Sequence, residues 1–217
     1  MKTALVAGAS GLIGRYLLNE LLDSGNYQQV KALLRKPVKK VHPVFQQVPF
    51  DYAKPDASLV DAEVVFCCLG TTLKKAGSKD AFRKVDFQYP LDLAKMAFEN
   101  GCKRFAIVTA IGSDKNSRFF YSRVKGELEQ ELQKIPFESL HVYRPSMLLG
   151  PRSEFRVGEE IGKTFMKVAG FLFPKNYRAV HASQVANAMV SDDMHPEKGI
   201  HFVESGEMLK FSIKKSI

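Results

Sequence analysis

Residues 3–14 read TALVAGASGLIG, and this stretch decides the fold. The apolar run at residues 3–7 has the length of a buried β-strand, and a glycine cluster stops it. From Leu12 onward the apolar residues recur at helical spacing, and Gly25 ends that pattern. A strand that passes through a glycine-rich turn into an amphipathic helix predicts the first unit of a dinucleotide-binding sheet.

The turn itself places Gly8, Gly11 and Gly14 at three-residue intervals. Glycine permits a tight turn and lets the backbone approach a pyrophosphate closely. The helix that follows offers unpaired N–H groups and the positive end of its dipole. We therefore predict a site for the diphosphate of a dinucleotide, with a purely structural turn as the alternative.

The rest of the chain alternates between strand-like and helix-like patterns. Further strands are expected at 30–34, 44–50, 62–70, 103–110, 138–145 and 200–205, and further helices at 86–100, 123–134, 158–173 and 183–194. Such alternation predicts an α/β fold, a Rossmann-like doubly wound parallel sheet with helices on both faces. No linker interrupts the pattern, so residues 1–217 are expected to form one NAD(P)-binding domain. Within it, residues 145–217 would contribute a small C-terminal substrate cap.

Composition narrows the function classes. The 217 residues are 45% hydrophobic and 25% charged, which is typical of a globular protein. The chain has no apolar run of about 18 residues, so no membrane span is expected. The three cysteines lack the spacing of a metal site, so we expect no metal and reduced thiols in a cytoplasmic protein.

The formal net charge of +9 calls for an anionic partner. No recognition motif for nucleic acid accompanies the charge, so nucleic-acid binding is not expected. Part of the excess lies at Arg35 and Lys36, where the second predicted strand ends. An acidic residue at this place would bind the ribose 2′-hydroxyl of NAD, whereas two cations suit the 2′-phosphate of NADP. We predict NADP as the cofactor, with two ordinary solvated charges as the alternative.

Tyr121 and Lys125 stand four residues apart, on one face of a predicted helix. A free tyrosine has a pKa of about 10 and is a poor acid at neutral pH. A neighbouring ammonium group lowers that pKa because it stabilises the phenolate, so the phenol can exchange a proton with a substrate oxygen. The pair predicts acid–base catalysis, with an exposed tyrosine beside a lysine as the alternative.

The glycine turn and the Tyr/Lys pair together resemble the short-chain dehydrogenase/reductase superfamily. The similarity is closest to its atypical branch, that of the Tat-interactive protein oxidoreductases, and extends over roughly residues 3–190. The stretches that carry it are CCLGTTLKKAG (67–77), KVDFQYPLDLAKMAFENGCKRF (84–105), SDKNSRFFYSRVKGELE (113–129) and YRPSMLLGPRSEFR (143–156).

The resemblance implies roles for individual residues. It makes Tyr121 the catalytic tyrosine and Lys125 the lysine that binds the cofactor ribose. The implied contacts to the cofactor diphosphate are Ser10, Gly11, Leu12 and Ile13, within the turn that Gly8 and Gly14 bound. Arg35 and Lys36 would bind the adenosine phosphate, Leu69 and Gly70 the adenine ribose, Asp51 the adenine amino group, and Leu148 and Arg156 further parts of the cofactor.

One segment departs from the family pattern. The superfamily usually has a serine after the fifth strand that hydrogen-bonds to the substrate oxygen, whereas this segment reads TAIGS at residues 109–113. Thr109 is the first candidate for this catalytic hydroxyl, and Ser113 is the second.

Several other residues have two interpretations. His181 is expected to pack in the core or cap the helix at 183–194, of which Ser183 is the expected N-cap, but His181 could also approach the substrate. The lysines of a loop after the fourth strand are expected to be solvated, or else to attract an anionic substrate; they are Lys74, Lys75 and Lys79. Four aromatic residues are expected in the core or around an apolar pocket: Phe155, Phe165, Phe171 and Phe173.

These observations favour an NADPH-dependent oxidoreductase that reduces a carbonyl of an unidentified small molecule. An NADP(H)-binding regulator that contacts a protein partner or a second copy of the chain is the alternative. A sugar-nucleotide epimerase is less favoured, because the chain after Arg144 is short for the substrate domain of such enzymes.

Overall fold

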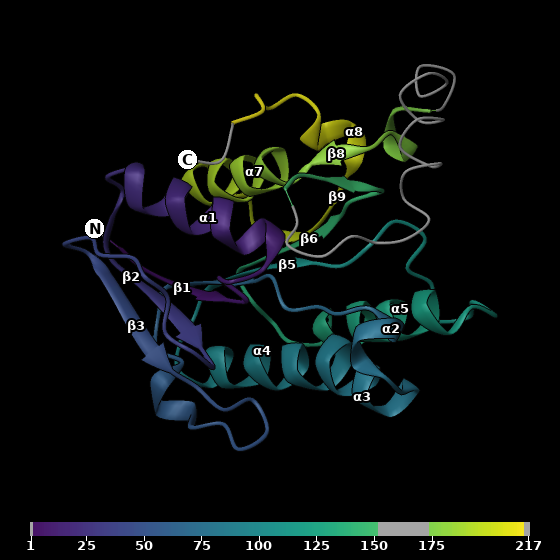
Figure 1. Ribbon diagram of the computed structural model, residues 1–217, viewed down its shortest axis with the longest axis horizontal. Coiled ribbons are helices and arrows are strands. Elements are labelled where there is room, and N and C mark those ends of the chain that lie inside the picture. Colours follow the sequence, from purple (N-terminus) through teal and green to yellow (C-terminus); the bar gives the residue numbers. More distant parts are fainter. Residues whose placement is uncertain (1, 152–173, 215–217) are drawn as a thin grey trace.

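The centre of the protein is a seven-stranded parallel sheet, seen in a computed structural model that describes residues 2–151 and 174–214 (Figure 1). The strand order is β3-β2-β1-β4-β5-β6-β9. The strands are β1 Lys2–Ala7, β2 Tyr27–Leu34, β3 Phe45–Pro49, β4 Val64–Cys67, β5 Arg104–Val108, β6 Ser139–Arg144 and β9 Gly199–Glu204. Each pair of neighbours is parallel, which confirms the predicted Rossmann-like sheet.

Two layers of helices cover the sheet. The helices among the described residues are α1 Leu12–Asp23, α2 Leu73–Ala76, α3 Lys79–Arg83, α4 Tyr89–Glu99, α5 Phe120–Leu132, α7 Ala182–Met194 and α8 Ser205–Met208. A turn of π-type, Lys84–Gln88, leads into α4, and single 3-10 turns occur at Ala57–Leu59 and Lys175–Tyr177. The predicted helix at 158–173 lies outside the described residues.

The alternation of β1 divides the core between the two faces of the sheet. Ala4 and Val6 pack with α1 and α7 on one face, whereas Leu5 and Ala7 pack with α4 and α5 on the other. Figure 1 shows these helix pairs on opposite sides of the sheet. All four β1 side chains are fully buried, as expected for a strand covered on both faces.

Only a small part of the described C-terminal region stands apart from the main sheet. α7 covers one face of that sheet and β9 extends it, whereas Leu148–Leu149 (β7) and Val180–His181 (β8) form a separate two-stranded sheet. The expectation that Ser183 caps α7 is wrong. The helix begins one residue earlier, and the His181 side chain accepts the capping hydrogen bond from the Ser183 backbone N–H. None of the helices in the described ranges is long and apolar enough to cross a membrane.

The strand order places a crevice at the end of β1. The chain runs outward from β1 to β2 and β3, then crosses back to β4 on the other side of β1. Ligands of open α/β sheets bind at such a reversal, beyond the carboxyl ends of the strands. The glycine turn follows β1, and the loop that begins with Cys68 follows β4, so both lie at this reversal.

Candidate functional site

The glycine turn depends on missing side chains at two positions. Gly8 has φ +82°, and a Cβ there would lie 2.6 Å from the Cys68 carbonyl oxygen in the loop after β4. A Cβ on Gly14 would lie 2.1 Å from the Gly8 carbonyl oxygen. The Gly11 N–H donates to that same oxygen over 2.9 Å and closes the turn. β1, α1 and the loop after β4 can therefore approach one another this closely only because the first and third positions of the turn have no side chain.

The start of α1 is available to an anion. Gly11 is the N-cap, with extended backbone and no side chain to accept hydrogen bonds, and the first turn contains no acidic residue. The first N–H groups of a helix have no partner within the helix. Ser10 and Gly11 are exposed and Leu12 is half-buried, whereas Ile13 and Gly14 are buried. The geometry fits the predicted diphosphate contacts of the turn.

The segment after β7 reaches the same turn. A Cβ on Gly150 would lie 3.1 Å from a methyl carbon of Leu12, and the Arg15 guanidinium donates to the Pro151 carbonyl over 3.2 Å. The structure thus brings the strand of Leu148 next to the start of α1. Arg156, predicted as a further cofactor contact, lies outside the described residues, as do Phe155, Phe165, Phe171 and Phe173.

The residues predicted to bind the adenosine end occupy the same edge of the sheet. Arg35 and Lys36 follow β2 directly, and both are exposed. The register pairs Leu34 of β2 with Pro49 of β3, which places exposed Asp51 close behind the neighbouring strand end. The Asp51 carboxylate accepts a hydrogen bond from the Ala53 N–H over 2.9 Å.

Tyr121 and Lys125 lie on α5 in different environments. Tyr121 belongs to the first turn of α5 and is 38% exposed, and its ring centroid lies 5.6 Å from that of Phe82 in α3. Lys125, one turn further along, is only 3% exposed. The helix therefore exposes the phenol of Tyr121 to solvent and keeps the ammonium group of Lys125 buried one turn further along.

Asp86 is the partner of Lys125, and the sequence analysis missed it. The Lys125 Nζ lies 2.8 Å from one carboxylate oxygen of Asp86, and the other oxygen accepts from the Thr71 N–H over 2.8 Å. A Cβ on Gly70 would lie 3.5 Å from the Asp86 carboxylate, so the β4 loop, Asp86 and Lys125 are in contact. Asp86 is 1% exposed. The available signal was a carboxylate in the KVDF stretch at a buried position of a helical pattern.

Burial and charge act on Lys125 in opposite directions. Desolvation on its own would lower the pKa of Lys125, but the Asp86 carboxylate and the nearby Tyr121 phenol outweigh it and raise the pKa above its ordinary value. The lysine is therefore charged at neutral pH despite its burial. Its ammonium group interacts electrostatically with both the Asp86 carboxylate and the Tyr121 phenol.

The two candidate hydroxyls both have protein partners. The Thr109 hydroxyl is buried, 2.6 Å from a carboxylate oxygen of Glu129. Glu129 in turn accepts two hydrogen bonds from the Arg144 guanidinium, over 3.2 and 2.5 Å. The half-buried Ser113 hydroxyl donates to the Ala110 carbonyl over 2.7 Å. Donation to a substrate oxygen would require either side chain to rotate.

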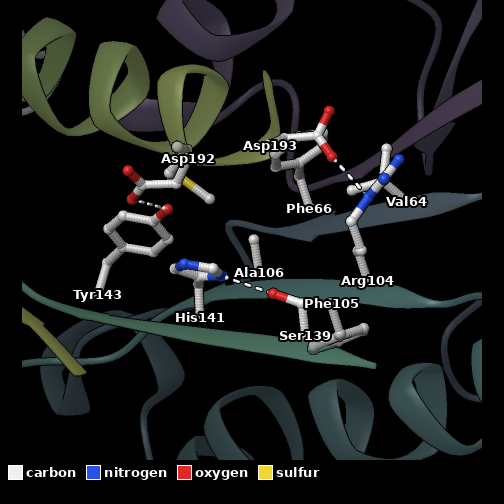
Figure 2. Close-up of a pocket in the computed structure, with 11 residues that line it drawn as sticks. Val64, Phe66, Arg104, Phe105, Ala106, Ser139, His141, Tyr143, Asp192 and Asp193 are labelled. Carbon is white, nitrogen blue, oxygen red and sulfur yellow. Dashed lines mark hydrogen bonds and ion pairs between the residues drawn. The ribbon is translucent and has the colours of Figure 1, made fainter. Parts of the chain in front are cut away.

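A second cluster of ionisable residues lies at the opposite end of the sheet, around a cavity of about 10 Å³ (Figure 2). Arg104, the first residue of β5, pairs with Asp193 of α7 over 2.9 Å, and the Tyr143 hydroxyl donates to Asp192 over 2.7 Å. Such a cavity holds about one water molecule. No residue of the predicted site lines it.

Comparison with known proteins places the chain in a family. The sequence profile of a family described as HIM1 matches residues 38–176. The protein HTATIP2 of Rattus norvegicus is 35% identical over 204 residues, which cover 91% of this chain and 84% of that protein. The mitochondrial protein FMP52 of Eremothecium gossypii is 31% identical over 218 residues, which cover 95% of each chain.

Solved structures agree on the fold at lower sequence identity. MoeE5 in complex with UDP-glucose and NAD superposes with a TM-score of 0.72 at 16% identity, covering 96% of this chain and 80% of that chain. A putative NAD-dependent epimerase/dehydratase from Bacillus halodurans superposes with a TM-score of 0.70 at 17% identity, covering 97% and 99%. The predicted relationship to atypical short-chain dehydrogenases is confirmed, and the chain belongs to the HIM1 family as a homologue of HTATIP2 and the FMP52 proteins.

Proposed function

We propose that the protein is an NADPH-dependent oxidoreductase that reduces a carbonyl group of a small molecule. The observation that carries the proposal is the arrangement on α5. Tyr121 is exposed one helical turn before the buried, charged Lys125, and Lys125 contacts the loop of Gly70 at the crevice of the sheet. A phenol beside a retained cation is a suitable acid for a carbonyl oxygen.

The crevice fits a dinucleotide. The glycine cradle at Gly8 and Gly14, which a Cβ would fill, and the uncapped start of α1 suit the diphosphate. Arg35 and Lys36 suit a 2′-phosphate, and Asp51, Leu69 and Leu148 complete the proposed contacts. The NAD in the MoeE5 structures supports a nicotinamide dinucleotide in general, and the two cations support NADP in particular.

The residues of the chain have separate tasks in this reaction. When bound, NADPH supplies a hydride to the carbonyl carbon. The Tyr121 hydroxyl gives its proton to the carbonyl oxygen, and Lys125 stabilises the phenolate that remains and binds the ribose. Thr109 and Ser113 are the two hydroxyls that can orient the carbonyl, of which Ser113 is the more accessible.

Replacing Tyr121 by phenylalanine tests the proposal. We expect turnover of an aldehyde panel, followed as NADPH oxidation, to fall about 1000-fold, because general acid catalysis typically contributes 100- to 10000-fold. The dissociation constant of NADPH should stay within about twofold, because the phenyl ring keeps its packing against Phe82. Tyr177→Phe is the matched control, since Tyr177 is also exposed and lies on the turn at Lys175–Tyr177.

The same titrations separate the alternatives. Tight NADPH binding without turnover of any aldehyde, in the wild type and in Tyr121→Phe alike, would favour the regulator. Equal affinity for NADH and NADPH would reject the phosphate role of Arg35 and Lys36. The absence of any dinucleotide affinity would reject both the oxidoreductase and the regulator hypotheses.

The cytoplasmic location expected from the cysteines stays a prediction. Cys67 and Cys102 are buried free thiols and Cys68 is half-buried, consistent with a reducing compartment. The FMP52 relatives are named mitochondrial. Fractionation of cells that express the tagged chain would decide between the two locations.

A further inference from the structure

The positive charge of the chain is concentrated around Tyr121. Residues 72–84 hold five cations and one carboxylate, and residues 113–123 hold three cations and one carboxylate. These two segments therefore account for +6 of the formal net charge of +9. Arg35 and Lys36, the cations proposed to bind the cofactor, belong to neither segment. The proposed cofactor site therefore does not account for the positive charge of these two segments.

Both segments are fastened to the first turns of α5, on which Tyr121 lies. Phe82 of α3 is fully buried and its ring packs against the rings of Phe120 and Tyr121, with centroids 5.8 and 5.6 Å apart. On the other side, the Asp114 N–H donates to the Ser122 carbonyl over 3.1 Å. Figure 1 shows α3 close to α5, in agreement with these ring contacts. The two segments flank the exposed phenol.

The loop at 113–118 approaches α5 closely because residue 126 is glycine. A Cβ on Gly126 would lie 2.2 Å from the Lys115 backbone nitrogen, so no side chain fits between loop and helix. The Arg123 guanidinium fastens the same loop by donating to the Ser117 carbonyl over 2.9 Å. The position of the cations on this loop is therefore set by the packing of its backbone.

Two cations are held against the ring of Phe120, the residue before Tyr121, without being neutralised. The Lys79 Nζ lies 5.5 Å from the ring centroid of Phe120, and the Arg123 guanidinium carbon lies 5.9 Å from it. An aromatic ring attracts a cation through its quadrupole and leaves the net charge in place. In the described ranges neither cation forms an ion pair with a carboxylate, whereas nearby Arg83 pairs with Glu127 over 2.5 Å.

We infer that Lys79 and Arg123, held by Phe120, recognise an anionic group on the substrate, a carboxylate or a phosphate. The inference rests on the proposed function, because the reacting carbonyl lies at Tyr121. A surface cluster of charges of one sign raises the local concentration of molecules of the opposite charge and speeds their association. Phe119, 77% exposed, offers apolar surface beside the cations, so substituted benzaldehydes are suitable probes.

Three probes test the inference: 4-formylbenzoate, 4-formylphenyl phosphate and the uncharged methyl 4-formylbenzoate. We expect kcat/KM for at least one anion to exceed that of the ester about tenfold at low salt, which corresponds to about 1.4 kcal/mol and is a modest effect because both charge contacts are exposed. The preference should fall as ionic strength rises. Comparison of the two anionic probes shows whether the site prefers a carboxylate or a phosphate.

The variant Lys79→Gln/Arg123→Gln should bring the anions within about twofold of the ester, with NADPH affinity unchanged. The matched control is Lys54→Gln/Lys95→Gln, which removes two exposed cations from other parts of the surface and should keep the preference. Lys79→Glu alone keeps the Arg123 bond to the loop and should still abolish the preference. A preference that survives in both Lys79 variants overturns the inference.

Failure of the inference differs from failure of the proposed function. Turnover of all three probes at equal kcat/KM overturns the anion site and leaves the oxidoreductase intact. If no probe turns over, calorimetric titration of 4-formylbenzoate into the NADP-loaded protein decides. Binding that is lost in the double variant supports the anion site, and no binding overturns it. Charge-dependent binding to phosphatidylserine vesicles without discrimination among the probes also overturns it, in favour of a membrane surface.

Discussion

At the carboxyl end of the sheet Tyr121 is 38% exposed and Arg35 and Lys36 are exposed, whereas at the amino end the buried Asp193 is surrounded by protein partners. There Asp193 accepts from the Tyr27 hydroxyl over 2.6 Å and pairs with Lys2 and Arg104 over 2.5 and 2.9 Å. Figure 2 shows the Arg104 pair beside the neighbouring bond from Tyr143 to Asp192.

The comparison shows that perturbed ionisation alone does not mark a functional site. At the amino end burial, followed by the charge of Asp193, raises the pKa of Tyr27, and burial lowers the pKa of His141. These shifts are typical of a structural network, because each group there meets a protein partner and the cavity holds only about one water. At the carboxyl end the exposed groups retain the capacity to bind a ligand.

The largest expected effect comes from Gly14→Ala. Its Cβ would lie 2.1 Å from the Gly8 carbonyl oxygen, so β1 and α1 must separate. We expect a loss of at least about 4 kcal/mol in the free energy of unfolding, measured by urea denaturation, and loss of NADPH binding. Gly70→Ala is the control for stability alone, since its Cβ would meet its nearest atom at an ordinary 3.5 Å, whereas Gly70 belongs to the proposed cofactor contacts. A normally stable Gly14→Ala protein would contradict the role of the turn.

The second effect concerns the buried pair at the carboxyl end. Asp86→Asn keeps an acceptor for the Thr71 N–H but leaves the Lys125 ammonium buried without its carboxylate. We expect the free energy of unfolding to fall by about 4 kcal/mol at neutral pH. Asp80→Asn, at an exposed position of α3, should leave it unchanged.

The pH dependence of the stability of Asp86→Asn tests whether Asp86 and Lys125 interact through their charges. In the wild type the raised pKa of Lys125 contributes stability below about pH 10.4, the unfolded value, and that contribution is lost as pH rises through the folded pKa. Without Asp86, desolvation lowers the folded pKa instead, so the variant becomes more stable as pH rises toward the unfolded value. The difference between the two proteins should therefore narrow at alkaline pH, and a constant difference would reject the charge interaction.

The smallest of these effects is expected at the amino end. Asp193→Ala leaves Lys2 and Arg104 partly buried without their carboxylate, and we expect a loss of about 3 kcal/mol in unfolding free energy. NADPH affinity and aldehyde turnover of the folded protein should not change. Glu138→Ala breaks only the exposed pair with Lys103 and should cost less than about 0.5 kcal/mol. A change in NADPH affinity in Asp193→Ala would contradict a purely structural role for the network at the amino end.

The element order could be predicted because local signals agreed. Each predicted strand within the described residues is present, and β3 tolerates Pro49 because it forms an edge of the sheet. Short elements such as α2, α3, β7 and β8 gave no periodic signal, since they span only two to five residues. The predicted N-cap at Ser183 was wrong because the side chain of His181, two positions earlier, caps the helix.

The sequence by itself determined the glycine turn, the α/β alternation and the four-residue spacing of Tyr121 and Lys125, because each is a property of neighbouring residues. Only the tertiary structure decided that Asp86 and the β4 loop meet Lys125, that Glu129 occupies the Thr109 hydroxyl, and that Phe120 holds Lys79 beside Tyr121. These contacts join residues far apart in the chain. Their energies depend on burial and distance, which no local pattern encodes.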